Sequence, residues 1–497
     1  MIFNQIPGNI IAPIVSFEVN SGGQFENRSR LLLIGHKSAD AVIADDVPTI
    51  CPSIAEARRL AGTGSMLDDM VRMARRNAPV QEIWIVAAPE TGTSGTRTIT
   101  VDTVPSAGVG VIEIAGEPVR FVVASGDTDA AVATAIAAAV NGYFNQLTGA
   151  SLPFTASATD EVVTLTARHK GTICNQIDIY VPPLDGANVA SGNVTIAVGS
   201  AGTGTPDISA TLAALGDDEF DWIVSPFNDA TSVAAYKTLL NDTSGRWAWN
   251  RQIYGHVYYP MSDTIGNLVT AGLAQDDRHL TILPTIASSV VPQPTWQWVA
   301  GMFAKVAPWL SDGATGNVSR NQTGLVVEGL LPPRDRSGWL DHATRESFLG
   351  SGLSTWKVDT AGNVVVDKII TTSRTFNSVP DTTFRDIQKI GQIVYSLRYF
   401  RQRLTIEHGQ KAVADDNPAN IETVSTPADI KATFLHAYTQ LQRRGVLENA
   451  VRAADLIEVA RNGDNPNRVD IKAPLDMVNP LDVIAANAVI YSQFAAA

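Results

Sequence analysis

The sequence predicts a mixed α/β protein with several domains: a doubly wound α/β body, an inserted β-rich domain, an α+β C-terminal domain, and extended N- and C-terminal arms. Three observations lead to this prediction. Apolar segments of strand length alternate with capped helices in two separate parts of the chain, which is typical of a parallel sheet covered by helices. A part rich in Gly, Thr, Ser and Val lies between them. A chain of 497 residues is also too long for one ordinary core.

Residues 1–22 are predicted to form an N-terminal arm. Pro7 and Pro13 interrupt a short apolar run, and residues 15–19 alternate apolar and polar as a half-buried strand does. Ser21-Gly22-Gly23 then marks a flexible joint. An apolar strand on such a joint needs a partner, and the side chains expected to pack against it are Ile10, Ile11, Ile14, Val15, Phe17 and Val19.

The α/β body is predicted to comprise residues 23–89 and 205–325. Ser53 and Ser65 each begin a Ser-x-x-acid capping pattern, so a helix is expected after each of them. Two further helices are expected at residues 230–240 and around 265–274. Buried strands are expected at residues 31–34, 81–88, 221–224, 253–259 and 279–283.

Residues 90–204 are predicted to form a β-rich domain inserted into the body. The βα pattern stops before this stretch and restarts after it, which indicates an insertion. One Ala-rich helix is expected at residues 129–140. Short alternating runs that predict strands lie at residues 98–101, 111–114, 119–123, 162–167, 177–181 and 194–198.

Residues 326–479 are predicted to form an α+β domain. Strands are expected at residues 363–371 and 468–472. Thr383 is expected to cap a long helix that carries Ile387, Ile390, Val394 and Leu397 on one face. Thr426, Pro427 and Asp429 predict a second helix, which Gly445 ends.

Residues 480–497 are predicted to form a C-terminal arm that begins at the joint Asn479-Pro480. The segment is apolar and carries no charge after Asp482. Its expected contact side chains are Leu481, Val483, Ile484, Val489, Ile490 and Phe494.

Charge and cysteine content limit the class of protein. A formal net charge of −13 argues against a nucleic-acid-binding surface, which needs a basic face. No apolar segment is long enough to predict a membrane span, and the first residues lack the features of a signal peptide, so synthesis in the cytoplasm is expected. The two cysteines, Cys51 and Cys174, exclude a disulfide scaffold. Two reduced thiols are the favoured interpretation, and a disulfide between copies is the alternative.

Catalytic patterns are absent from the sequence. It contains no G-x-x-x-x-G-K-[ST] loop, no G-x-S-x-G elbow and no H-E-x-x-H helix. His36 and His256 are placed where α/β enzymes locate their sites, but His256 lies in an aromatic run and is expected in the core. The sequence therefore predicts no catalytic residue, no metal site and no cofactor.

Five stretches resemble one known family. Near the C-terminus the chain has an N-P-x-R-h-D strand at residues 465–470, a P-x-D-h-V-N turn at 474–479 and an apolar tail to Phe494, where h is apolar. The other stretches are residues 6–10, 166–178, 369–372 and 445–449. In this combination and order the sequence resembles Mu-like phage tail sheath proteins. Residues 471–474 are more polar than the family pattern, and residues 495–497 extend past its closing Phe.

The resemblance implies a structural subunit and not an enzyme. Such subunits stack as hexameric rings around a tail tube protein, between baseplate and tail terminator proteins, and contract to drive the tube through the host envelope. It implies a virion protein that is assembled in the host cytoplasm, with no nucleic-acid partner and no membrane insertion. Sheaths of related pyocin-like or secretion systems are the alternative, and an α/β hydrolase or oxidoreductase is a more distant one.

The resemblance also implies where copies meet. The two chain ends of such subunits cross to neighbours and add strands to a sheet in the neighbour's C-terminal domain, while the joints let the bodies rotate. The acceptor strands would then carry Val364, Val366, Ile369, Val469 and Ile471. The basic residues of the long helix are the candidates for contact with the tube: Lys389, Arg398, Arg401 and Arg403.

Overall fold

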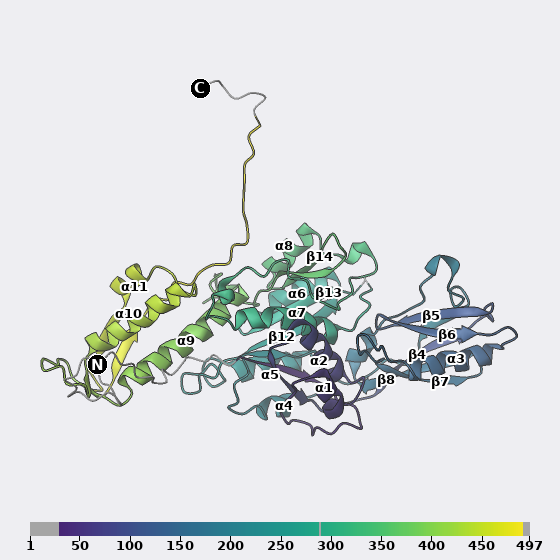
Figure 1. The fold of residues 1–497 in the computed structure, drawn as a ribbon, viewed down its shortest axis with the longest axis horizontal. Coiled ribbons are helices and arrows are strands. Elements are labelled where there is room, and N and C mark those ends of the chain that lie inside the picture. Colours follow the sequence, from purple (N-terminus) through teal and green to yellow (C-terminus); the bar gives the residue numbers. More distant parts are fainter. Residues whose placement is uncertain (1–28, 288–289, 491–497) are drawn as a thin grey trace, which may run out of the picture.

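The computed structural model describes residues 29–287 and 290–490. Figure 1 shows an elongated molecule in which a central body lies between a β-rich insert at one end and a helical C-terminal part at the other. The last described residues leave the body as a long extended segment. The predicted mixed α/β class is confirmed.

The body contains a six-stranded sheet in the order β13-β12-β11-β1-β3-β2. The first five of these strands are parallel, and the short β2 pairs antiparallel at the edge. The parallel strands are buried on both faces, as their apolar runs predict. The bounds are β1 Arg30–Gly35, β2 Thr49–Ile50, β3 Glu82–Ala87, β11 Trp222–Val224, β12 His256–Asp263 and β13 Leu280–Ile286.

Helices cover both faces of this sheet. Tyr258 and Tyr259 are neighbours on β12 and therefore point to opposite faces. Tyr258 stacks on Phe303 of α7 (Thr295–Leu310), whereas Tyr259 packs against Tyr236 of α5 (Ala230–Leu240). The other body helices are α1 Ile54–Ala61, α2 Met66–Asn77, α4 Ser209–Ala213, α6 Ile265–Ala274 and α8 His342–Gly350.

The predicted starts of α1 and α2 are confirmed, but neither capping box is complete, because the Asp68 carboxylate accepts the Gly64 N–H in place of the Ser65 N–H. The Ser53 and Ser65 hydroxyls accept the backbone N–H groups of Glu56 and Asp68, respectively, at 3.1 Å. The Glu56 carboxylate instead binds Arg59 one turn later. The Glu56 carboxylate thus binds the Arg59 guanidinium, which is a stronger partner than the Ser53 backbone N–H.

The strand expected at residues 253–259 begins three residues later, at His256. Gln252 and Tyr254 have positive φ angles of 52° and 57°, which no strand accepts. The fully buried Arg246 guanidinium holds this turn by donating to the Tyr254 carbonyl at 2.9 Å.

The insert contains two antiparallel sheets and one helix. A four-stranded sheet has the order β10-β4-β8-β7, and a three-stranded sheet has the order β6-β5-β9. Helix α3 (Asp129–Asn141) packs against strands of both sheets. The strands are β4 Ser94–Val101, β5 Gly108–Ile114, β6 Glu117–Val123, β7 Phe154–Thr159, β8 Val162–Lys170, β9 Ile179–Tyr180 and β10 Val194–Val198.

The C-terminal part is built on α9 (Ile387–His408) and α10 (Pro427–Arg443). The Phe400 and Phe434 rings stack at 4.1 Å and begin a second hydrophobic core, which is separate from that of the body. Strands β14 Thr355–Val358 and β15 Val364–Lys368 pack in the core of the body. The remaining elements are β16 Thr375–Phe376, β17 Val379–Pro380, β18 Ala412–Val413, β19 Val424–Ser425, α11 Ala450–Leu456, β20 Glu458–Arg461 and β21 Val469–Lys472.

The two helix caps predicted in this part have different outcomes. The Thr426 box is confirmed, with the Thr426 hydroxyl accepting Asp429 N–H at 3.2 Å and the Asp429 carboxylate accepting Thr426 N–H at 2.8 Å. The predicted Thr383 cap is wrong. Helix α9 begins at Ile387, and the Thr383 hydroxyl donates to Asp381 instead.

Candidate functional site

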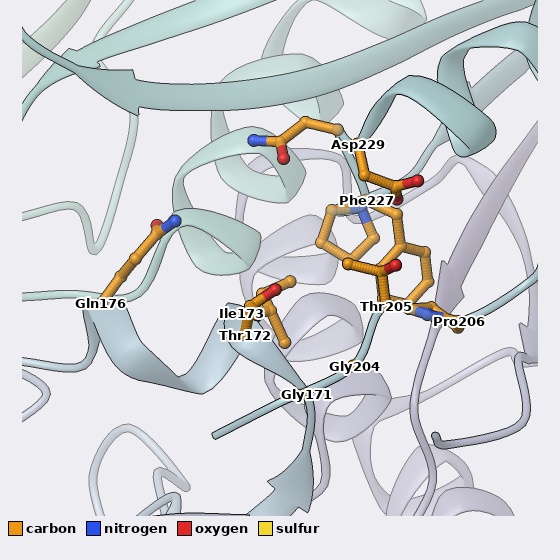
Figure 2. A pocket seen from close by; sticks show the side chains of 11 residues that line it. Gly171, Thr172, Ile173, Gln176, Gly204, Thr205, Pro206, Phe227 and Asp229 are labelled. Carbon is orange, nitrogen blue, oxygen red and sulfur yellow. The ribbon is translucent and has the colours of Figure 1, made fainter. Parts of the chain in front are cut away.

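The carboxyl edge of the body sheet is where an α/β enzyme would bind its substrate. Strand order reverses between β1 and β11, because the chain proceeds to β3 on one side and to β12 on the other. Ligands of open α/β sheets bind at this kind of switch point. Here the insert follows β3 and covers the edge. A cavity of about 130 Å³ lies at this edge, lined by residues 171–173 and 176 of the insert, by the returning chain at 204–206 and by the loop after β11 (Figure 2).

His36, one of the two candidate histidines, lies beneath the insert at this edge. It is 1% exposed, and its ring lies 5.0 Å from Phe227 and 5.7 Å from His169 of the insert. His169 Nε2 accepts the Met66 backbone N–H at 2.8 Å, so Nδ1 carries the proton and donates to Glu90 at 2.5 Å. These bonds join the insert to the start of α2.

The candidate side chains described at this edge and in the sheet interior have structural partners. The Asp229 carboxylate in the cavity caps α5 by accepting from Thr231 and Ser232. His256 is fully buried, shares a hydrogen bond of 2.8 Å with Thr281, and packs against Trp222, which confirms it as a core residue. Among the described residues, no group of three or more His, Cys, Asp or Glu could hold a metal ion.

The buried groups at this edge give the protein a specific pH dependence. Burial lowers the pKa of His36 to about 4 and raises the pKa of Asp68 to about 6. His36 binds a proton at a higher pH in the unfolded chain than in the folded protein, so acidification from pH 6.5 to 4 lowers the free energy of unfolding. Asp68 binds a proton at a higher pH in the folded protein than in the unfolded chain, so acidification over nearly the same range raises the free energy of unfolding. The two contributions oppose each other.

We therefore expect Asp68→Asn to steepen the loss of stability on acidification. The asparagine can still accept the Gly64 N–H, which Asp68 accepts at 2.9 Å, so the structural change is small. The variant should lose on the order of 2 kcal/mol more than the parent between pH 6.5 and 4. Urea unfolding of both proteins at several pH values measures this difference. Parallel pH profiles would contradict the opposing role of Asp68.

The C-terminal segment has no fold of its own. Residues 479–490 form neither helix nor strand, and Figure 1 shows them leaving the body. Five of the predicted contact side chains, Leu481, Val483, Ile484, Val489 and Ile490, have exposed fractions between 61% and 92%. Within the described part of the chain, no hydrogen bond or ion pair joins residues 483–490 to the rest. Phe494 and the predicted N-terminal contact residues, Ile10, Ile11, Ile14, Val15, Phe17 and Val19, lie outside the described residues.

The predicted acceptor residues lie in two different sheets. Val364 and Val366 belong to β15, which is buried in the body, pairs with β14 on one edge and bonds to the backbone of residues 324–327 on the other, and Ile369 follows it. Val469 and Ile471 belong to β21, which pairs antiparallel with β20 beside α10. The β20–β21 sheet contains no third described strand, so both of its strands have a free edge.

Comparison with known proteins identifies the family. The model of the phage tail sheath protein central domain matches residues 201–372, and the model of the phage tail sheath C-terminal domain matches residues 370–491. Together the two matches span more than half of the chain. This chain belongs to the phage tail sheath family.

Several individual proteins are similar to this chain. The sheath protein is 27% identical to the Mu-like prophage FluMu tail sheath protein of Haemophilus influenzae over 498 residues, which is 97% of this chain and 98% of the relative. The crystal structure of a sheath tail protein from Desulfitobacterium hafniense matches 94% of this chain and 97% of its own, with a TM-score of 0.50 and 14% identity. The crystal structure of a sheath tail protein from Listeria innocua matches 92% of this chain and 93% of its own, with a TM-score of 0.48 and 12% identity.

The basic residues predicted to touch the tube are all engaged within this sheath protein. Arg398 binds Asp221 and Glu219, and Arg401 donates to the carbonyl of Gln252 and the hydroxyl of Tyr254. Arg403 pairs with Glu407 one turn later, and Lys389 donates to Met477 and Asn479. Arg398 and Arg401 hold α9 to the body and Lys389 holds it to the C-terminal segment, whereas the Arg403 pair lies within α9.

The two cysteines lie inside the sheath subunit as free thiols. Burial raises the pKa of Cys51 to about 11 and that of Cys174 to about 12, so neither is an accessible thiolate. A disulfide between copies would require both to leave the core, so the structure favours the two reduced thiols. No helix in residues 29–287 or 290–490 is long and apolar enough to cross a membrane.

The structure also assigns residues that the sequence did not single out. Asn321, Lys368 and Gln392 bind the first residues of the C-terminal segment. Their partners lie between 86 and 160 positions away in the chain, so no local spacing could have identified them.

Proposed function

We propose that this chain is the repeating subunit of a contractile tail sheath, and that its chain ends are its functional site. The subunits would stack as hexameric rings around a tail tube protein, between a baseplate and a tail terminator. One observation carries the proposal: residues 483–490 are apolar, extended and exposed. A monomer gains nothing from exposing such a segment, whereas a polymer can bury it against a neighbour.

The β20–β21 sheet of a neighbouring copy is the proposed acceptor. Isolated two-stranded sheets are marginally stable, and their free edges offer unpaired backbone groups to a further strand. An added strand contributes main-chain hydrogen bonds, and its alternate side chains give specificity. The buried β14–β15 strands are a less suitable target, because body residues already cover them. Head-to-tail contacts of this kind generate helical assemblies when they do not close.

Contraction would be a change between two packings of rigid subunits that stay linked by their ends. We assign the rigid parts to the body, which includes α8, β14 and β15 in addition to residues 23–89 and 205–325, to the outer domain 90–204, and to the rest of the predicted inner domain 326–479, with arms at 1–22 and 480–497. The similarity to the Mu-like prophage FluMu tail sheath protein supports the proposal that this chain is part of a phage virion and not of a related injection system. Assembly would then take place in the host cytoplasm.

Truncation tests the exchanged segment. A chain that ends at Asp482 should fold like the full chain, because residues 483–490 make no described contact, but it should not form tubes. A chain that lacks only residues 495–497 is the matched control and should assemble. Circular dichroism and negative-stain microscopy measure the two properties. Normal tubes from the shorter chain, or a discrete monomer that turns over a substrate, would contradict the proposal.

A further inference from the structure

Two successive sets of contacts, an inner level and an outer level, hold the start of the C-terminal segment to its own subunit. The inner level consists of the contacts made by residues up to Asn479. Gln392, which is fully buried, donates to the Val478 carbonyl at 2.8 Å, and Lys389 donates to the Asn479 side chain at 2.8 Å. The Val478 N–H also binds the Val446 carbonyl at 3.2 Å. Gln392 is buried, so its hydrogen bond is costly to break, and we expect this inner set of contacts to stay closed.

The outer level holds Leu481 and Asp482. The Asp482 carboxylate pairs with the Lys368 ammonium at the end of β15. The Asn321 amide donates to the Leu481 carbonyl at 2.6 Å and to Asp482 at 3.2 Å. The Asn321 side chain is itself fixed, because its oxygen accepts the Thr323 N–H at 2.7 Å.

The outer level can open at low cost. Lys368 also pairs with Asp386 at 3.0 Å, so it keeps one carboxylate when Asp482 leaves. The Asp482 side chain is 33% exposed and would be solvated after release. An ion pair that opens toward water is worth about 1 kcal/mol or less, in contrast to a pair whose charge stays buried alone.

We propose that Lys368 and Asn321 are positioning residues that form a releasable latch on the C-terminal arm, and this inference rests on the proposed function. With the latch closed, the arm leaves the subunit from Asp482. With the latch open, it leaves from the joint Asn479-Pro480. Three more residues then join the free link, which adds about 10 Å of reach. Neighbouring subunits could separate by that distance while the exchanged strand remains paired.

Distance measurements on the unassembled full-length subunit test the latch. Two spin labels, one on Asn487→Cys in the arm and one on Thr360→Cys in the body, report the direction of the arm. The native thiols are buried, so they should not be labelled. In the background of these two changes, Asp482→Ala should at least double the width of the distance distribution. It should leave Lys368 paired with Asp386 and so keep the fold.

Asp464→Ala is the matched control, because it removes an exposed aspartate from a loop that does not touch the arm, and it should leave the width unchanged. Equal widths for Asp482→Ala and the parent would overturn the latch. The measurement needs no polymer. Failure of the latch is therefore distinguishable from failure of strand exchange, which the truncation at Asp482 tests by tube formation.

Discussion

Replacing Asp221 by asparagine should lower the free energy of unfolding of the subunit by about 3 kcal/mol, because it leaves a buried cation without its main partner. Both oxygens of the Asp221 carboxylate accept from Arg398 of α9, at 2.7 and 3.0 Å. The two side chains are only 7% and 11% exposed. Arg398 would keep Glu219, but that residue is half exposed and contributes less. Urea denaturation of the unassembled subunit measures the loss.

Asp217 provides a matched control four residues earlier. It makes a salt bridge of similar length with Arg251, at 2.7 Å, but its side chain is 85% exposed. Asp217→Asn should therefore change stability by less than about 1 kcal/mol. Adding Arg398→Met to Asp221→Asn should restore part of the loss, because the buried charge is then removed. Equal effects of Asp217→Asn and Asp221→Asn would refute the importance of burial.

Burial of Arg398 also explains why the basic residues predicted to touch the tube do not form an open basic surface on the subunit. From sequence alone, Arg398, Arg401 and Arg403 form a cationic cluster on an acidic protein, which suggests a contact face. The carboxylate that binds Arg398 lies 177 positions earlier in the chain. A pairing of this kind depends on how α9 docks on the body, and no local pattern encodes it.

The predicted capping box formed only where no other residue bound its carboxylate. Thr383 and Thr426 each stand three residues before an aspartate, so the sequence predicts the same cap at both. Asp429 is free to bind the backbone and completes the box. Asp386 instead pairs with Lys368 at 3.0 Å, and α9 starts after it. The same competition left Glu56 on Arg59.

Strand partners were the least predictable part of the candidate site. Alternation and apolar content predicted the strands near residues 363–371 and 468–472, and both are present. The two strands lie in different sheets, because pairing is non-local and each strand has a different neighbour, β14 or β20. The exposed C-terminal segment was predictable, since eight residues after Asp482 are uncharged and cannot pack onto a body that already has a complete core.

Gly391→Ala should destabilise the subunit by about 2 kcal/mol or more, although alanine normally stabilises a helix relative to glycine. Gly391 lies inside α9 where the helix touches the end of α7. A Cβ atom there would come within 2.5 Å of the Leu310 carbonyl oxygen and 2.8 Å of a Val318 methyl group. The backbone carbonyl cannot move without disturbing α7, so α9 itself must shift.

Gly266→Ala is the control for this substitution. Gly266 lies in α6, and a Cβ atom there would meet nothing within 4 Å. Alanine should therefore be neutral or stabilise by up to about 1 kcal/mol. The two variants should move the midpoint of urea denaturation in opposite directions. Stabilisation by both would show that α9 does not pack as closely on the body as the structure indicates.

The effect of Gly391→Ala should extend to the arm, because α9 carries the residues that hold its base. Lys389 and Gln392 flank Gly391 and bind residues 477–479. A shift of α9 should weaken both contacts and broaden the distance distribution between labels at positions 360 and 487, even with Asp482 intact. Gly266→Ala should leave that distribution unchanged. A narrow distribution in Gly391→Ala would mean that the outer latch alone sets the direction of the arm.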